Sequence, residues 1–161
     1  MAVSADEFKQ ACAHWATGVA VVTALSGDRV HGMTVSAFSS VSLEPPLVLV
    51  CAEKTTNTLP FIEEGRVFAV NVMAAGQEAL CNKFASKKQE WQRFDGLEWE
   101  TAATGAPVLP GTQACLDCRV VACHDAGDHV IYVGEVEWVR VDGGRDPLLF
   151  FAHSYGHFHR E

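Results

Sequence analysis

Apolar residues recur along this chain in short runs separated by turn-forming residues, a pattern typical of β-strands joined by tight turns. The segment 30–42 follows the run 19–25 after the turn letters Ser-Gly-Asp, which predicts a hairpin. Pro45-Pro46 then interrupts the chain. The run 47–52 is apolar at every position, which predicts a central strand covered on both faces. Further strands are predicted at 67–73, 114–124, 129–141 and 147–151.

Helical spacing is confined to short segments. Ser4 and Glu7 have the spacing of a capping box, and apolar residues follow at helical intervals, which predicts a helix over about 5–15. A helical turn or two is expected within 55–64, and a second helix within 76–85. Residues 86–112 are polar, without a sustained period, and predict a long loop of the kind that covers a site.

This order of elements predicts a single domain over residues 1–161 that is mainly β, an antiparallel barrel with a few short helices. The chain shows no internal repeat and no βαβ rhythm. It also lacks the glycine-rich turn from strand to helix that marks many dinucleotide sites. We therefore do not expect a doubly wound parallel sheet.

Composition and charge narrow the partners. The chain has 161 residues, of which 48% are hydrophobic, and no apolar run long enough for a membrane helix. Its start lacks the pattern of a secretory signal, so we expect a cytoplasmic protein with reduced cysteines. The formal net charge of −8 disfavours nucleic acid. However, Lys83, Lys87, Lys88 and Arg93 gather a third of the positive charge in one stretch, where a small anion would be favoured.

Hydroxyl side chains are concentrated between residues 32 and 50, at Thr34, Ser36, Ser39, Ser40 and Ser42. Strand alternation places Thr34 and Ser36 on one face. Periodicity alone favours an ordinary solvent-facing strand over a ligand site. Because the next run, 47–52, is too apolar for an edge strand, we expect its neighbour to lie in mid-sheet. Small hydroxyl side chains there would leave room for a ligand.

These hydroxyls belong to a set of segments that resembles the flavin reductase family, the small reductase components of two-component monooxygenases, of the 4-hydroxyphenylacetate and phenol hydroxylase reductase kind. The resemblance runs in order over nearly the whole chain, although each segment alone is weak. It is carried by TGVAVVTA (17–24), GMTVSAFSSVSLEPPLVLVCAEKTTNTL (32–59), FAVNVM with Gln77, KFA (83–85), GAPVL (105–109) and GDHVIYVGEV (127–136).

The resemblance implies a fold, an activity and partners. The fold would be a split β-barrel with Greek-key topology of the FMN-binding type. The protein would bind FMN or FAD, oxidise NADH or NADPH, form a homodimer and supply reduced flavin to a partner monooxygenase. In such an enzyme the nicotinamide and flavin do the chemistry, and the protein binds and orients them.

The resemblance also assigns site residues. One segment would lie along the flavin ring: Met33, Thr34, Val35, Ser36 and Ala37. A second would follow the ribityl chain and phosphate: Cys51, Ala52, Glu53, Lys54, Thr56, Asn57 and Thr58. A third region would be Phe84 and Ala85, with Lys87 and Lys88 as weaker candidates. Near the nicotinamide it places Gly127, Asp128, His129 and Tyr155. We assign His129 the catalytic role of positioning the nicotinamide or steadying negative charge on the flavin, without abstracting a proton.

Simpler interpretations remain open for several of these residues. The Thr-Thr-Asn-Thr run also suits helix capping, and the lysines suit a helix C-terminus. Cys115 and Cys118 are interpreted as core thiols because their spacing places them on opposite strand faces. The histidines at 153, 157 and 159 lack acidic or thiol partners nearby, so we assign no metal.

Two other functions fit the same barrel. One is a flavin-binding module without reductase turnover, for flavin storage or redox sensing. The other is an oxidase of a pyridoxamine-like phosphate, against which the intact Gly127-Asp128-His129 segment argues. Consumption of NADH in the presence of flavin separates the reductase from both.

Overall fold

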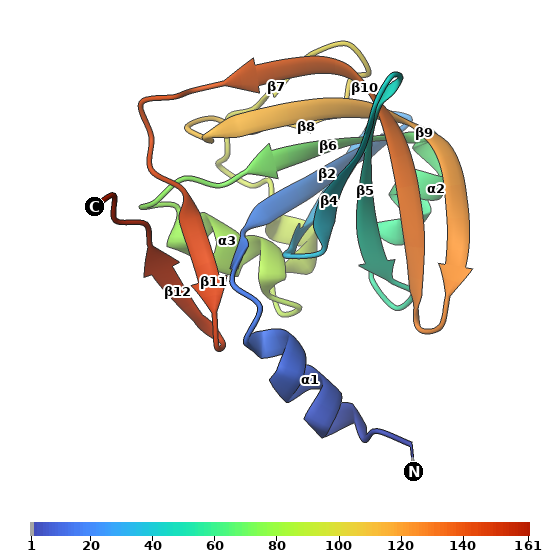
Figure 1. Ribbon diagram of the computed structural model, residues 1–161. Helices are drawn as coiled ribbons and strands as arrows, with labels where there is room; N and C mark the ends of the chain where they lie inside the picture. The colour runs from blue at the N-terminus through green and yellow to red at the C-terminus, as the bar shows by residue number, and fades with distance from the viewer. Residues whose placement is uncertain (1) are drawn as a thin grey trace.

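The computed structural model describes residues 2–161, which contain mostly antiparallel β-structure with three α-helices (Figure 1). The helices are α1 Ala5–Ala13, α2 Leu59–Gly65 and α3 Glu78–Ala85, with a 3-10 turn η1 Glu90–Gln92. The strands are β1 Thr17–Gly18, β2 Ala20–Ser26, β3 Arg29–Val35, β4 Phe38–Leu43, β5 Pro46–Glu53, β6 Val67–Val72, β7 Glu100–Thr101, β8 Pro107–Val108, β9 Ala114–Ala126, β10 His129–Val141, β11 Leu148–Phe151 and β12 Ser154–His157.

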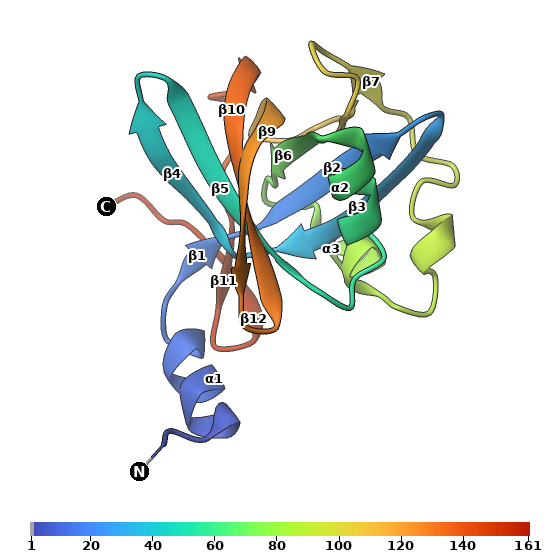
Figure 2. The same cartoon turned by 90° about the vertical axis from the view of Figure 1, so that its right-hand side faces the viewer.

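Seven strands form one antiparallel sheet in the order β3-β2-β6-β9-β10-β5-β4. In a flat sheet, six strand spacings would place the two outermost strands about 29 Å apart. Yet β3 and β4 are consecutive in the chain, and the three Cα steps from Val35 to Phe38 span at most about 11 Å. The sheet therefore curls until its edges meet at one corner, and β3 and β4 diverge from it (Figure 2).

No pairing joins β3 to β4 within residues 2–161, so the curled sheet is not a closed barrel. Two smaller sheets complete the β-structure. One contains β1, β11 and β12, and the other contains β7 and β8. The predicted predominance of antiparallel strands with few helices is confirmed.

The segment 30–42 differs from its prediction as one strand in mid-sheet. Its first part, β3, forms the expected hairpin with β2, but the strand ends at Val35. Its second part, β4, pairs with β5, with Phe38 opposite Val50. Both strands are sheet edges, so the mid-sheet expectation was wrong, whereas β5 is central between β10 and β4. The alternation of side chains in the sequence does not reveal this change of partner, because β3 and β4 both have the two-residue period of a strand.

Two large apolar clusters stabilise the curled sheet. Inside the curl, Phe68 and Tyr132 pack with Phe61 and Ile62 of α2, and all four are at most 5% exposed. On the outer side, α3 packs on β2 and β3 and buries Phe84 against Val21. Cys115 and Cys118 are both buried, in separate clusters, as predicted.

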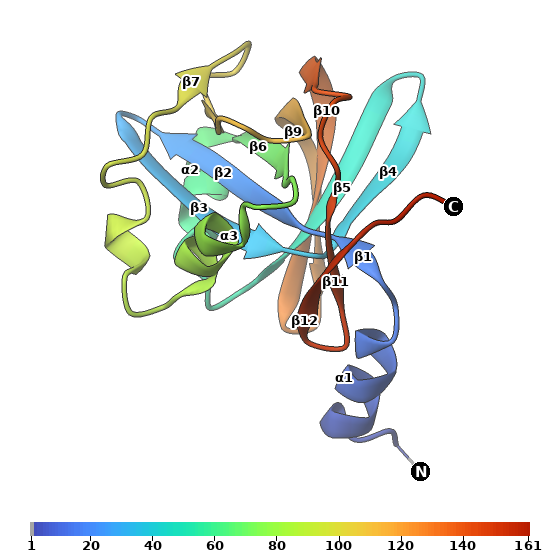
Figure 3. The ribbon, with the colours of Figure 1, turned by 90° about the vertical axis from the view of Figure 1, so that its left-hand side faces the viewer.

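The helix α1 stands away from the sheets (Figures 1 and 3). Its capping box is present: Ser4 Oγ accepts from Glu7 N at 3.2 Å, and Ser4 N donates to Glu7 Oε2 at 2.9 Å. The helix ends at Ala13, two residues before the predicted end, and none of its residues is buried. Among residues 2–161, no helix is both long and apolar enough to cross a membrane.

Gly65 allows α2 to pack on β2, and we expect Gly65→Ala to lower the free energy of unfolding by about 3 kcal/mol or more. A Cβ at this position would lie 1.7 Å from the carbonyl oxygen of Leu25, which is backbone and has little freedom to move. Alanine has a higher helix propensity than glycine, so a loss of stability in Gly65→Ala would be due to the clash. Urea unfolding measures it. Gly143→Ala, where a Cβ meets nothing within 4 Å, is the control. An unchanged midpoint for Gly65→Ala would contradict the expectation.

Candidate functional site

A polar cleft of about 470 Å³ opens where β3 ends. Its walls come from the end of β3, the end of β5 with the turn after it, the end of α3, the loop containing η1, and the first residue of β10. It is lined by Met33, Thr34, Val35, Ser36, Ala37, Cys51, Glu53, Thr55, Thr56, Asn57, Phe84, Ala85, Lys87, Glu90, Arg93 and His129. Two cations, two carboxylates and several hydroxyls therefore face one space.

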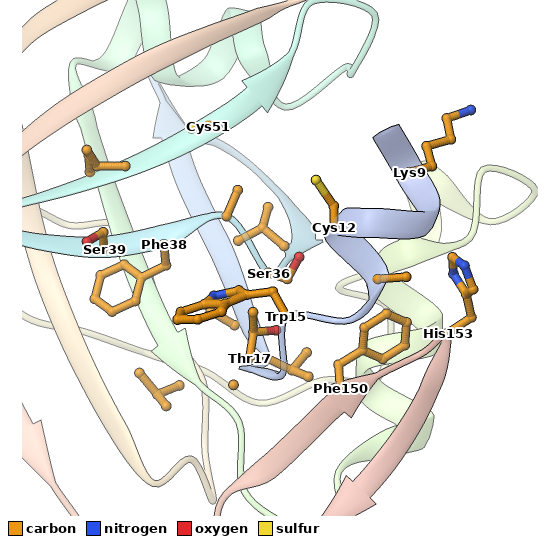
Figure 4. A pocket seen from close by; sticks show the side chains of 18 of the residues that line it. Lys9, Cys12, Trp15, Thr17, Ser36, Phe38, Ser39, Cys51, Phe150 and His153 are labelled. Atoms are coloured by element: carbon orange, nitrogen blue, oxygen red, sulfur yellow. The ribbon is translucent and has the colours of Figure 1, made fainter. Parts of the chain in front are cut away.

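A larger, mainly apolar cleft of about 910 Å³ adjoins it (Figure 4). Its walls are α1 with the residues that follow it, the segment around Val35–Ser39, part of β5 and β6, and the β11–β12 hairpin. Trp15, Phe38 and Phe150 face this space in Figure 4. Trp15 is 77% exposed, although it is a large apolar side chain.

The two clefts share Val35, Ser36, Ala37 and Cys51. These residues lie at the corner where the edges of the sheet meet, and Cys51 N donates to the carbonyl of Ala37 at 3.1 Å across that corner. The combined space is apolar at one end and bears two cations, two carboxylates, hydroxyls and the amide of Asn57 at the other. Such a space suits a ligand that has a flat apolar ring and a charged, hydroxylated tail.

The structure brings twelve of the eighteen residues assigned from sequence to the wall of the polar cleft. These are Met33, Thr34, Val35, Ser36, Ala37, Cys51, Glu53, Thr56, Asn57, Phe84, Ala85 and His129. The remaining six, which lie elsewhere, are Ala52, Lys54, Thr58, Gly127, Asp128 and Tyr155. Segments far apart in the sequence thus converge on one cleft, although Ala52, between Cys51 and Glu53 of β5, is buried away from it.

The six outlying residues have other contacts. Ala52 and Thr58 are fully buried. Lys54 Nζ lies 2.7 Å from Asp125 Oδ1, and its backbone N–H donates to the carbonyl of Asp128 at 2.9 Å. Tyr155 Oη donates to Asn82 Oδ1 at 2.9 Å, and its ring packs edge-on against Phe150. Direct contact of these six residues with a ligand stays a prediction.

The hydroxyl of Thr34 already has a partner. Its Oγ1 donates to the carbonyl of Cys81 in α3 at 2.7 Å. A ligand in the cleft would therefore find only the acceptor side of this oxygen. Burial raises the pKa of the Cys51 thiol, which keeps this cysteine neutral at ordinary pH and disfavours a role as nucleophile.

Arg93 is the cleft cation that sequence reasoning did not assign to the site. It is 4% exposed and is fixed by two carbonyls: Nη1 donates to Gly32 O at 2.7 Å and Nη2 donates to Ser86 O at 2.9 Å. Its Nε is buried and has no hydrogen-bond partner among residues 2–161. Burial lowers the pKa of Arg93, while the carboxylate of Glu90 acts in the opposite direction.

Glu90 was also missed, and Lys87 had been weighed only as a weak candidate, whereas Thr55 belongs to the segment 51–58 that the resemblance assigns to the ribityl chain and phosphate. Thr55 Oγ1 donates to Glu53 Oε1 at 2.7 Å. Glu90 Oε2 accepts from Asn57 Nδ2 at 2.8 Å, across 33 residues of chain. The concentration of cations at 83–93 was the available sequence signal, but no pattern in the sequence indicated the pairing of Glu90 with Asn57.

His31 lies next to the cleft, among aromatic side chains. Its ring stacks on Phe61 at 5.1 Å between centroids and meets Trp91 edge-on at 5.1 Å. Nδ1 lies 2.8 Å from Thr58 Oγ1, and the buried Nε2 has no partner among residues 2–161. Burial lowers the pKa of His31 to about 4, and the nearby charge of Arg93 lowers it as well. His31 is therefore neutral at physiological pH.

His129 opens β10 opposite Glu53 of β5. Its Nδ1 lies 2.7 Å from Asp128 Oδ1, and this hydrogen bond lowers the pKa of Asp128. With Nδ1 engaged, Nε2 is the nitrogen left to meet a ligand. The side chain of His129 is 42% exposed at the mouth of the cleft, and Asp128 is 90% exposed. His129 therefore presents its imidazole at the edge of the polar cleft.

Comparison with known proteins identifies the family. The flavin reductase like domain matches residues 12–159, so the chain belongs to this family. It is 44% identical over 154 residues to the FMN reductase (NADH) SmoA of Agrobacterium fabrum, covering 96% of this chain and 86% of that protein. It is 34% identical to the flavin-dependent monooxygenase reductase subunit HsaB of Rhodococcus jostii, covering 96% and 78% of the two chains.

A solved structure is similar over the whole fold. It is the NADH:FAD oxidoreductase SgcE6 of Streptomyces globisporus in complex with NAD and FAD fragments. The TM-score is 0.89 at 33% sequence identity, and the alignment covers 99% of this chain and 97% of that chain.

The buried, neutral His31 makes stability depend on pH. Its pKa is about 4 in the folded protein and about 6.5 when unfolded, so the unfolded chain binds the additional proton between these values. The unfolding free energy should therefore fall as the pH drops from about 6.5 to 4, by up to about 3 kcal/mol from this residue. His31→Gln, which removes the titration, should flatten the fall. Urea unfolding at several pH values measures it. The exposed His159→Gln is the control. Equal slopes for wild type and His31→Gln would contradict the assignment.

Proposed function

We propose that this chain is an NADH-dependent flavin reductase that reduces FMN or FAD and releases the reduced flavin to a flavin-dependent monooxygenase. The observation that carries the proposal is the pair of joined clefts, apolar at one end and polar, with charged side chains, at the other. The proposal treats residues 1–161 as one flavin reductase-like domain with a split β-barrel of Greek-key topology. The named activities of the relatives support it, because SmoA is an FMN reductase using NADH and HsaB is a monooxygenase reductase subunit.

The cleft residues fit a flavin nucleotide. The small side chains of Ser36 and Ala37 at the shared corner leave space for a flat ring against the backbone. Asn57, Lys87 and Arg93 supply an amide and two cations for a phosphate, and Thr56 adds a hydroxyl. A bound flavin supplies the redox chemistry, since it accepts a hydride from the nicotinamide. The chain's part is to hold both groups in register and to exclude water around them.

The role we propose for His129 follows from its place at the mouth of the polar cleft. The hydrogen bond to Asp128 fixes Nδ1 and the orientation of the ring, so that Nε2 is available for a hydrogen bond with an incoming nicotinamide. Such a residue acts by positioning. We therefore expect it to affect use of NADH more than retention of flavin.

We also propose that the protein is a homodimer. The support is the amount of uncovered apolar surface around α1 and the apolar cleft. Phe8 and Trp15, which line the apolar cleft, are 63% and 77% exposed, and α1 buries none of its residues within its own chain. Large uncovered patches of this kind commonly mark an interface between proteins. A second copy would cover α1 and narrow the apolar cleft.

Steady-state kinetics tests the activity. The four pairings of NADH or NADPH with FMN or FAD should include at least one NADH pairing that gives sustained turnover, seen as loss of NADH absorbance. Tightly retained flavin without turnover would favour a flavin-binding module instead. Absence of NADH and NADPH oxidation with either flavin would contradict the reductase assignment.

In the same assay, His129→Asn should lower kcat/KM for NADH by about tenfold. His124→Asn, at an exposed histidine of β9, should leave kcat/KM unchanged.

Light scattering during gel filtration tests the dimer. At micromolar concentration the wild-type protein should elute with twice the mass of one chain. Trp15→Asp should shift it toward the monomer, because the substitution places a charge in the proposed apolar contact. Trp99→Asp, at an exposed aromatic residue of the long loop, is the matched control. A monomeric wild-type protein would overturn the proposal.

A further inference from the structure

Glu90 places a carboxylate inside the polar cleft, among the groups best suited to bind an anion. It is the first residue of η1, and its side chain is only 13% exposed. Oε2 accepts from Asn57 Nδ2 at 2.8 Å, and Oε1 lies 3.6 Å from Arg93 Nη1. The carboxylate is therefore engaged by an amide from one wall and a guanidinium from another.

Both partners of Glu90 are donors that a phosphate would use. Arg93 is held by the carbonyls of Gly32 and Ser86 independently of Glu90, so its position does not require the carboxylate. Its buried Nε has no partner among residues 2–161. A buried donor without a partner is costly unless a ligand completes it. Asn57 lies in the turn after β5, where hydroxyls and amides gather on the cleft.

We propose that Glu90 is an internal anion that competes with the phosphate of the flavin nucleotide for Asn57 and Arg93. This inference rests on the proposed function, because it assumes that a flavin nucleotide binds in the joined clefts. A carboxylate and a phosphate dianion repel one another strongly at contact distance outside bulk water. Glu90 must therefore leave Asn57 before the phosphate binds. Its return then favours release of the flavin.

The contacts of the long loop fit such an exchange. The far half of this loop is tied down by buried groups: Leu109 N donates to Asn71 Oδ1 at 2.8 Å, and Thr104 N donates to Asp117 Oδ2 at 2.8 Å. Around η1, Glu90 contacts Asn57 and Arg93, and Trp91 meets His31 edge-on. The next residues are anchored, because Arg93 donates to the carbonyls of Gly32 and Ser86 and Phe94 packs against Phe84, so the exchange moves the side chain of Glu90 and not the loop. A phosphate would replace the contacts of Glu90 to Asn57 and Arg93 with contacts of the same kind.

The competing explanation is that Glu90 serves only as the counter-ion of the buried Arg93. The two roles predict opposite signs. If Glu90 merely supports Arg93, then removing its charge should disturb the guanidinium and weaken binding of FMN. If Glu90 competes with the ligand, then removing its charge should strengthen binding of FMN and leave a flavin without phosphate unaffected.

The test compares binding of FMN and riboflavin to purified wild-type protein and Glu90→Gln, by quenching of flavin fluorescence. Glutamine keeps the shape and one hydrogen bond to Asn57 but not the charge. We expect Glu90→Gln to bind FMN about tenfold more tightly, equivalent to about 1.4 kcal/mol, and riboflavin within about twofold of wild type. Glu98→Gln, an exposed carboxylate of the same loop, controls for the change in net charge. Glu90→Ser gives a second route to the same result if the glutamine variant folds poorly.

The outcomes separate this inference from the proposed function. If wild-type protein binds FMN but Glu90→Gln binds it equally or more weakly, the role of Glu90 is overturned and the reductase assignment stands. An equal gain for FMN and riboflavin, or an equal gain in Glu98→Gln, also overturns competition at the phosphate. If wild-type protein binds neither flavin and consumes no NADH, then the proposed function and the inference both fall.

Discussion

The two-residue link between β3 and β4 is the constraint on which the rest of the structure depends. These strands are the opposite edges of a seven-stranded sheet, and Ser36 and Ala37 alone separate them in the chain. The link forces the sheet to curl, and the curl encloses the core around Phe68 and α2. The same link forms the wall that both clefts share. The fold and the two clefts thus have a single geometric origin, since the clefts join at the corner where the edges of the sheet meet.

Local elements followed from the sequence, but the partner of each strand did not. The β2–β3 hairpin, the central β5, the capping box of α1 and the two long final strands were predicted from apolar period and turn residues. The change of partner at Ser36 was not, because no glycine or proline marks it and strand alternation continues through it. What moves β4 to the far edge is its pairing with β5, which is a tertiary interaction. The hydroxyl-bearing residues Thr34 and Ser36 thus line the polar cleft, although the mid-sheet position expected for their strand was wrong.

The candidate site shows the same division. Residues in contiguous motifs, such as Thr56 and Asn57, line the polar cleft together, because a motif keeps its members close at the end of one strand. Ala52 and Thr58 do not, since neighbours in a strand or turn point to opposite sides and one side is core. Arg93 and Glu90 come from a loop without periodicity, whose path is set by the carbonyls that bind the guanidinium. Such residues can be assigned to the cleft only from the folded structure.

The charges of the polar cleft are balanced, although the site is proposed to bind an anion. Arg93 and Lys87 face Glu53 and Glu90 in the same space, within a chain of formal net charge −8. A site selected only for tight binding of a phosphate would not keep a carboxylate on its best donors. A reductase that hands its product to another protein has a different requirement, because its flavin must leave as readily as it arrives. A carboxylate that returns to Asn57 meets that requirement, since it satisfies the donors after release and spares the empty cleft an uncompensated buried charge.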